Sequence, residues 1–533
     1  MSTKQNPISD ILEMGDSHVS TRQSFTEVQN SDSAPKSPKR GIQQDPINDT
    51  LELQEEGDSQ HVSTRQSFKE VQNSDRALKP KRGTQILVAL LILLASMITN
   101  YLNTHILLLC IINTNNTKED ANSTNIANFE ITMQMDTWIR EYMIIIPLSA
   151  FFGGIAGGPC IEYLGRRYTI LATTLPYIGS FILIVLTQDA TVLLVGPALC
   201  GFSMGIISLS LSVYLCETMQ TKLRGRLGTL PNTFGNYGTI ICVILDIFLA
   251  REKMLLLSAS LLIFLIFILS LTPETPGWYI SKGKTAQSQK ILQTLRGTDT
   301  DITDELTMIE KLFIENERNV SHNTISKLLK RNNLKPLLVS LGLMWFQQMS
   351  GTYVVQFYMW EFIDITSTSL SMFRFVYSIS HFIFTRYIDK GRKKLLYISS
   401  VLMALSLFSF GGLLYAIPKD VDGSLKFLLG INLIVYMIGY LIGFGPIPWL
   451  IMGEILPAKT RSSTASIVTS FNWMCNFIVA KTFKNVVAVI GKPGIFWLFG
   501  VFVVVGFIFV IISVPETSGK SPKEIEESFK KNE

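Results

Sequence analysis

Residues 346–358, FQQMSGTYVVQFY, set side-chain amides into an otherwise apolar run. Gln347 and Gln348 are adjacent, and Tyr353 follows five positions after the second of them. An amide donates and accepts hydrogen bonds without carrying charge, so it suits the binding of a neutral, hydroxyl-bearing molecule. The structural alternative is that these glutamines only bond neighbouring helices to one another.

The apolar surroundings of these amides extend over most of the chain. The sequence has 533 residues, a mean hydropathy of +0.30 and only 17% charged residues, well below the roughly 25% of soluble proteins. Runs of about 18 or more apolar residues predict membrane-spanning helices, because lipid leaves unpaired backbone groups unsatisfied. We predict an all-α membrane protein with about twelve transmembrane helices, near 85–112, 142–162, 168–187, 191–215, 228–249, 254–272, 336–361, 369–388, 395–417, 426–452, 464–487 and 492–514.

Catalytic chemistry is not indicated by the residue pattern. The six cysteines lie in or beside apolar runs, and the five histidines show no metal-ligand spacing. No nucleophile, phosphate loop or carboxylate pair stands out. We therefore expect no enzyme activity, no metal and no cofactor. The net charge of +5 is interpreted as membrane topology, with no nucleic acid as a partner.

The first 84 residues are polar and contain a tandem repeat. DSHVSTRQSFTEVQNSD at 16–32 returns as DSQHVSTRQSFKEVQNSD at 58–75. Such sequence cannot bury enough apolar surface to fold, so residues 1–84 are predicted to be a disordered tail. Ser24 and Ser67 lie in identical Arg-Gln-Ser-Phe contexts and are candidate sites for basophilic kinases.

Basic residues orient the predicted spans. They gather in alternate connections, in the long segment 273–335 and near both ends of the chain. By the positive-inside rule these faces are cytoplasmic, which predicts a multi-pass protein with both termini inside. We expect the protein to lie in the plasma membrane. The first opposite connection, 113–140, holds the sequons of Asn115 and Asn122, two candidate glycosylation sites.

The chain also carries an internal repeat. Three features occur once in each half of the sequence: a basic hairpin, a glutamate with an arginine seven positions later, and a Pro-Glu-Thr motif. The repeat predicts two six-helix halves, at 85–272 and 336–514, joined by a cytoplasmic linker with short helices at 273–335 and followed by a cytoplasmic tail at 515–533. Duplicated halves are typical of transporters that expose a central site alternately to each side of a membrane.

The repeated charges suggest a gate at the cytoplasmic side. Charged side chains beside lipid each cost about 2.5–3.5 kcal/mol or more unless paired, so they are expected to pair. We predict that Glu217 and Arg224 pair with Arg392 and Lys393, across the halves. Likewise Glu454 and Arg461 are predicted to pair with the Arg166/Arg167 hairpin, near Glu162. Ordinary interfacial charges that reach toward water are the alternative.

Several motifs resemble one family in order and spacing. GGIAGGPCIEYLGRR, LGTLPNTFGN, FQQMSG, IGFGPIPWLIMGEILP, FNWMCNFIVAKTF and PETSGKS are similar to those of the sugar porter family of the major facilitator superfamily. The sequences of these motifs are most similar to those of the insect facilitated trehalose transporters. The resemblance covers about residues 85 to 525 and implies the major facilitator fold, a sugar as the small-molecule partner and membrane lipid as the surroundings.

The resemblance also implies a binding site for the hydroxyls of a sugar. Amides and an indole would hold the sugar, and its outer gate would be aromatic. The implied ligands are Asn232, Gln347, Gln348, Trp449, Asn472 and Asn476. Tyr353 stands where the family has asparagine and is predicted to lie in the same substrate cavity, and Phe357 and Tyr358 occupy the outer-gate positions. The chemistry agrees independently, because amides pair hydroxyls and an indole offers a flat apolar face.

Uncoupled transport is the implied mode. The first span contains no acid, and Pro197 stands where the family has an arginine, so no titratable group is evident for a proton symporter. The leading prediction is facilitated movement of trehalose or a hexose by alternating access. A sugar sensor that transports poorly, and a carrier of another small polar solute, remain the alternatives.

Overall fold

The computed structural model describes the chain in ten stretches: residues 82–119, 125–187, 189–297, 300–314, 331–357, 387, 391–416, 423–457, 460–520 and 522–530. All belong to one compact unit, Leu78–Glu533. The secondary structure in these stretches is helical throughout. Outside the described residues lie the predicted eighth span except residue 387, together with Ser24, Ser67, Asn122 and Tyr358. The side chains of Asn115, Arg224 and Phe357 also lie outside them.

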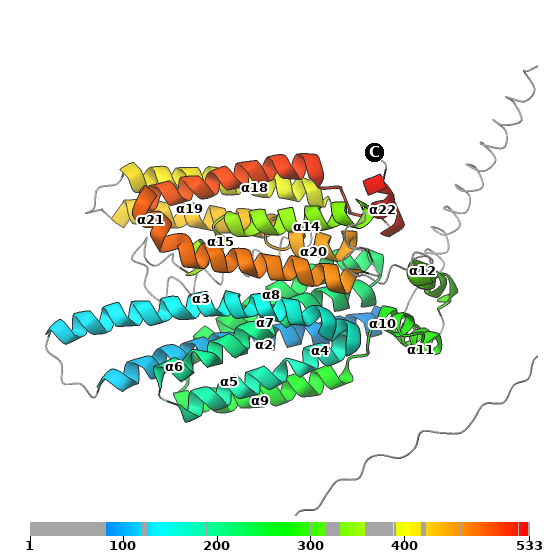
Figure 1. Ribbon diagram of the computed structural model, residues 1–533, viewed down its shortest axis with the longest axis horizontal. Coiled ribbons are helices and arrows are strands. Elements are labelled where there is room, and N and C mark those ends of the chain that lie inside the picture. Colours follow the sequence, from blue (N-terminus) through cyan, green and yellow to red (C-terminus); the bar gives the residue numbers. More distant parts are fainter. Residues whose placement is uncertain are drawn as a thin grey trace, which may run out of the picture. The chain divides into compact units, whose positions relative to one another are not determined.

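The N-terminal half consists of helices whose mutual packing buries one apolar core (Figure 1). They are α2 (Arg82–Glu119), α3 (Asn125–Tyr163), α4 (Arg166–Ala172), α5 (Thr174–Leu186), α6 (Ala190–Leu193), α7 (Val195–Thr218), α8 (Thr221–Phe248) and α9 (Arg251–Leu271). Helices α2 and α3 continue into the predicted outer connection, so Asn115 lies near the end of a helix.

The C-terminal half repeats this arrangement. Its helices are α14 (Arg331–Met349), α15 (Thr352–Phe357), α18 (Arg392–Ala416), α19 (Gly423–Ile442), α20 (Ile447–Ile455) and α21 (Arg461–Ser513). Helix α21 bends at Gly491, whose φ of 76° is a left-handed conformation that glycine adopts easily, and it carries Pro493 just beyond. The bend divides α21 into the two spans predicted at 464–487 and 492–514.

Short helices follow each half. After α9 come α10 (Pro276–Ser281), α11 (Thr285–Arg296) and α12 (Thr303–Ile314), and after α21 comes α22 (Pro522–Lys530). Figure 1 places α10, α11, α12 and α22 at one end of the long helices. Eight of the described helices are long and apolar enough to cross a membrane.

The two halves meet chiefly where α21 packs on α3, with a smaller contact to α7. Two glycines permit the approach to α21: a Cβ on Gly154 would lie 2.6 Å from Ser470 Oγ, and one on Gly158 would lie 2.7 Å from Ser466 Cβ. The Ser466 hydroxyl donates to the carbonyl of Gly154 at 2.7 Å. A third core joins the halves beside this contact, with Leu209 from α7 and Met452 from α20.

Replacing Gly158 by valine is expected to destabilise this arrangement by about 1–3 kcal/mol, because the added side chain meets Ser466 at the contact between the halves. The melting temperature of the purified protein in detergent measures the effect. Gly412→Val on α18 is the matched control, since a Cβ there has no atom within 4 Å. Equal losses in the two variants would contradict the close contact.

Candidate functional site

Three of the predicted amides form one hydrogen-bonded group between α14 and α21. Asn472 Nδ2 donates to Gln347 Oε1 at 2.9 Å, and Gln348 Nε2 donates to Asn472 Oδ1 at 3.2 Å. All three side chains are buried. Asn476 lies one turn further along α21, on the same face as Asn472, and is also buried. We call these four residues the amide cluster.

Two acceptor atoms of the amide cluster have no hydrogen-bond partner among the described residues. They are Gln348 Oε1 and Asn476 Oδ1, both shielded from solvent. A buried acceptor left without a donor costs about 1–3 kcal/mol. These two oxygens are therefore suited to receive hydroxyl or N–H donors from a bound molecule.

Gln347 has a different role from its neighbour. Its Nε2 donates to the carbonyls of Phe444 and Gly445 at 2.7 and 2.8 Å. Both carbonyls belong to the turn between α19 and α20, where the glycines and prolines of IGFGPIP interrupt the helix. Since both amide hydrogens are used and its oxygen accepts from Asn472, Gln347 holds the broken helix against α14. The interhelical interpretation thus fits Gln347, whereas Gln348 retains an unpaired acceptor.

The other two predicted ligands, Trp449 and Asn232, lie on different helices. Trp449 lies in α20 and packs, half-buried, against the core that joins the two halves. Asn232 lies in α8 of the opposite half, and its side chain is exposed. Helices α8 and α20 are in contact.

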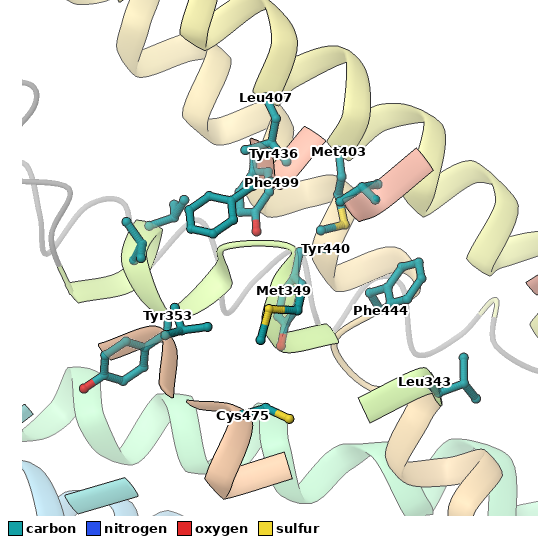
Figure 2. Close-up of a cluster of buried hydrophobic side chains, with 14 of the residues drawn as sticks. Leu343, Met349, Tyr353, Met403, Leu407, Tyr436, Tyr440, Phe444, Cys475 and Phe499 are labelled. Atoms are coloured by element: carbon teal, nitrogen blue, oxygen red, sulfur yellow. The ribbon is translucent and has the colours of Figure 1, made fainter. Parts of the chain in front are cut away.

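Tyr353 lies in α15 with its ring buried and its hydroxyl directed out of the C-terminal half. The hydroxyl donates to the backbone carbonyl of Met143 in α3 at 2.5 Å. Figure 2 shows the ring pointing away from Tyr436, Tyr440 and Phe499, which line the same core. The phenol therefore makes a contact between the halves.

Charged residues gather at the start of α4 in the N-terminal half. Arg166 Nη2 pairs with Glu217 Oε1 at 2.8 Å, and the Thr275 hydroxyl donates to the other oxygen of Glu217 at 2.7 Å. Glu274 accepts from the backbone N–H groups of Arg166 and Arg167, both at 2.9 Å. Burial raises the pKa of Glu274, although three backbone donors and the guanidinium of Arg166 act in the opposite direction.

The C-terminal half reproduces this charge cluster at the start of α18. Arg392 forms a buried ion pair with Glu454 and donates to the Thr517 hydroxyl at 2.7 Å. Glu516 accepts from the backbone N–H groups of Arg392 and Lys393, both at 3.1 Å. The carboxylate satisfies amides that the first turn of a helix leaves without partners.

The predicted pairing across the halves is wrong for these ion pairs. Arg166 pairs with Glu217, and Arg392 pairs with Glu454, each within one half. The physical reason is proximity, because each hairpin arginine begins a helix beside the carboxylate of its own half. Arg461 donates to the carbonyl of Leu456, again within its own half.

Sequence reasoning missed two members of the charge clusters. Glu274 and Glu516 are the glutamates of PETPGW and PETSGK. Their repetition at the same place after each half was the available signal, because a carboxylate and a basic hairpin that both recur in each half can form the same contact twice. Glu162, another predicted gate residue, has an exposed side chain. Its backbone carbonyl accepts a hydrogen bond from the Trp278 indole at 3.1 Å.

Among the residues that the structure describes, no group of three or more His, Cys, Asp or Glu side chains is placed to hold a metal ion. The amide cluster offers neutral donors and acceptors, and no nucleophile lies within its hydrogen-bonded group. This arrangement suits the binding of an uncharged, hydroxyl-rich molecule.

The chain is similar to several known proteins. The sequence model of a family described as "Sugar (and other) transporter" matches residues 84–529. The facilitated trehalose transporter Tret1 of Apis mellifera ligustica is 46% identical over 458 residues, covering 84% of this chain and 89% of that protein. Its namesake in Culex quinquefasciatus is 43% identical, covering 83% and 85%.

A solved structure has a similar fold. It is the proton:xylose symporter XylE of the major facilitator superfamily, bound to 6-bromo-6-deoxy-D-glucose. The TM-score is 0.71 at 21% identity, and the alignment covers 84% of this chain and 99% of that one. At this identity the likeness concerns the fold alone.

Proposed function

The chain belongs to the sugar (and other) transporter family, and on this premise we propose that it moves a sugar across a membrane by facilitated, uncoupled transport. Its fold is the predicted major facilitator fold. The proposed substrate is trehalose or a hexose. The names of the relatives, facilitated trehalose transporters, support this substrate class.

The proposed sugar-binding site rests on the two unpaired acceptors of the amide cluster. Gln348 Oε1 and Asn476 Oδ1 are buried and accept from no donor in the described part of the chain, and a sugar presents many hydroxyl donors. Trp449 offers an apolar face to the C–H surface of the sugar, and Asn232 contributes from the opposite half. Gln347 and Asn472 fix the geometry of the acceptors through their mutual hydrogen bond. Phe357 and Tyr358 are retained as outer-gate residues on sequence alone.

Alternating access requires the two halves to rock about the central site. The charge clusters of Arg166 and Arg392 support this step, because each locks the helix starts of one half into a rigid unit. We propose that they stabilise each half as a body and that contacts between the halves break and re-form in each cycle.

Topology and modification rest on the sequence. We propose a plasma-membrane location with both termini cytoplasmic, in accord with the distribution of basic residues. Glycosylation of Asn115 and Asn122 and phosphorylation of Ser24 and Ser67 by kinases are proposed on their sequence contexts.

Uptake of radiolabelled trehalose and glucose into oocytes tests the function. We expect uptake of at least one sugar that saturates with concentration and persists with a protonophore. Binding without uptake would support the sensor instead, and neither binding nor uptake would support a carrier of another solute. Uptake abolished by the protonophore would overturn the uncoupled mode.

A further inference from the structure

We propose that Tyr353 and Pro147 form a latch that joins the two halves at the α15 end of the helices. The latch is the hydrogen bond from the Tyr353 hydroxyl to the Met143 carbonyl, at 2.5 Å. Its role in a transport cycle rests on the proposed function, whereas the contact and its energetic consequence do not.

The acceptor of this bond is a carbonyl that a proline has set free. In an α-helix the carbonyl of residue 143 accepts from the N–H of residue 147. Residue 147 is Pro147, inside α3, and proline has no N–H. A carbonyl without a donor is costly within a bilayer, where water does not replace the lost bond. The Met143 oxygen is therefore available to a donor from another helix.

The donor comes from the opposite half and is itself well placed. Tyr353 is 7% exposed. Its ring points away from Tyr436, Tyr440 and Phe499 (Figure 2), and its hydroxyl reaches the Met143 carbonyl of α3. Because the ring is buried, the hydroxyl is presented to the oxygen with little loss of side-chain freedom. The match of a freed carbonyl on one half with a buried hydroxyl on the other distinguishes this contact from general packing.

A hinge lies two residues before Tyr353. Helix α14 ends at Met349, and Gly351 has a φ of 80°, which separates it from α15. The end of α14 is fixed, because the Tyr436 hydroxyl donates to the Ser350 carbonyl at 2.9 Å. The six residues of α15 thus turn about Gly351 while Gln347 and Gln348 stay in place. Release of the latch opens the α15 end, which faces outward under the proposed topology.

The test is the rate at which a membrane-impermeant maleimide labels a cysteine placed at Gln356, one turn beyond Tyr353, in the full-length protein on intact cells. In the Gln356→Cys background, Tyr353→Phe removes the hydroxyl and is expected to raise the labelling rate roughly fivefold, the effect of one lost hydrogen bond. Tyr101→Phe is the matched control, because its buried hydroxyl bonds within one half, to Met254. It is expected to leave the rate unchanged.

A second background separates the latch from a general loss of packing. Pro147→Ala restores an N–H to the Met143 carbonyl, so Tyr353→Phe no longer leaves an unpaired acceptor. We expect Tyr353→Phe to change labelling less than about twofold in that background. An equal change in both backgrounds, or no change with Pro147 present, would overturn the latch. The labelling rate does not depend on sugar transport. A failure of sugar uptake would therefore contradict the proposed function, and the labelling rates would still test the latch.

Discussion

Replacing Glu454 by glutamine is expected to lower the free energy of unfolding by about 3–5 kcal/mol, because it leaves the buried Arg392 without its counter-charge. The two side chains are 6% and 4% exposed, so water cannot take over the role of the carboxylate. Arg392 would keep its bond to the Thr517 hydroxyl, which carries no charge. The melting temperature of the detergent-solubilised protein, followed by size-exclusion chromatography, measures the loss.

Matched substitutions make this prediction specific. Glu217→Gln removes the equivalent carboxylate from the other half and is expected to act in the same direction. Glu252→Gln, at an exposed acid in the first turn of α9, is expected to have almost no effect. A double change, Arg392→Leu with Glu454→Leu, should regain much of the stability, since it leaves no uncompensated charge. A Glu454→Gln protein as stable as the Glu252→Gln protein would refute the buried pair.

Loss of the unpaired acceptors is expected to have the largest effect on sugar affinity. Asn476→Ala and Gln348→Ala should each raise the KM for uptake roughly tenfold, because each removes one acceptor for a sugar hydroxyl. The maximal rate should change less, since the lost bonds contribute to binding in general. Concentration series of labelled sugar, corrected for surface expression, give both quantities.

Two further variants test whether the effect belongs to the site. Asn432→Ala removes an amide of α19 that bonds Ser409 of α18, away from the amide cluster, and should leave KM unchanged. Gln347→Ala should instead reduce the yield of folded protein, because it leaves the carbonyls of Phe444 and Gly445 without donors. If Asn476→Ala and Asn432→Ala gave the same KM, the unpaired acceptors would have no part in binding.

Much of the fold follows from the sequence because lipid imposes it. Apolar length predicts spans, and the repeated motifs predict two halves, which the major facilitator fold of the relatives confirms. The predicted span ends near 112 and 142 agree with the apolar segments Gly83–Leu109 and Glu141–Tyr163, although α2 and α3 continue as helices into the connection 113–140. Hydropathy reports where lipid ends, and a helix can continue into water beyond that point.

The site was less predictable, because it depends on partners distant in the sequence. The amides were identified, but only the fold shows that Gln347 uses its hydrogens on a broken helix while Gln348 keeps a free oxygen. The charged residues were also identified, but their pairing within each half depends on where the helices begin. Tyr353 was predicted from the sequence to line the substrate cavity, but only the fold shows that its hydroxyl reaches a carbonyl freed by Pro147.

We propose that this chain equilibrates a sugar across a membrane without coupling to protons. The decisive measurement is the entry of labelled trehalose or glucose, added outside, into liposomes that contain the purified protein. We predict that the internal concentration rises to the external one and stops there, with or without an imposed pH gradient, and that Asn476→Ala slows the rise at low sugar. Accumulation above the external concentration when the outside is acidic would contradict the account, as would no entry of either sugar.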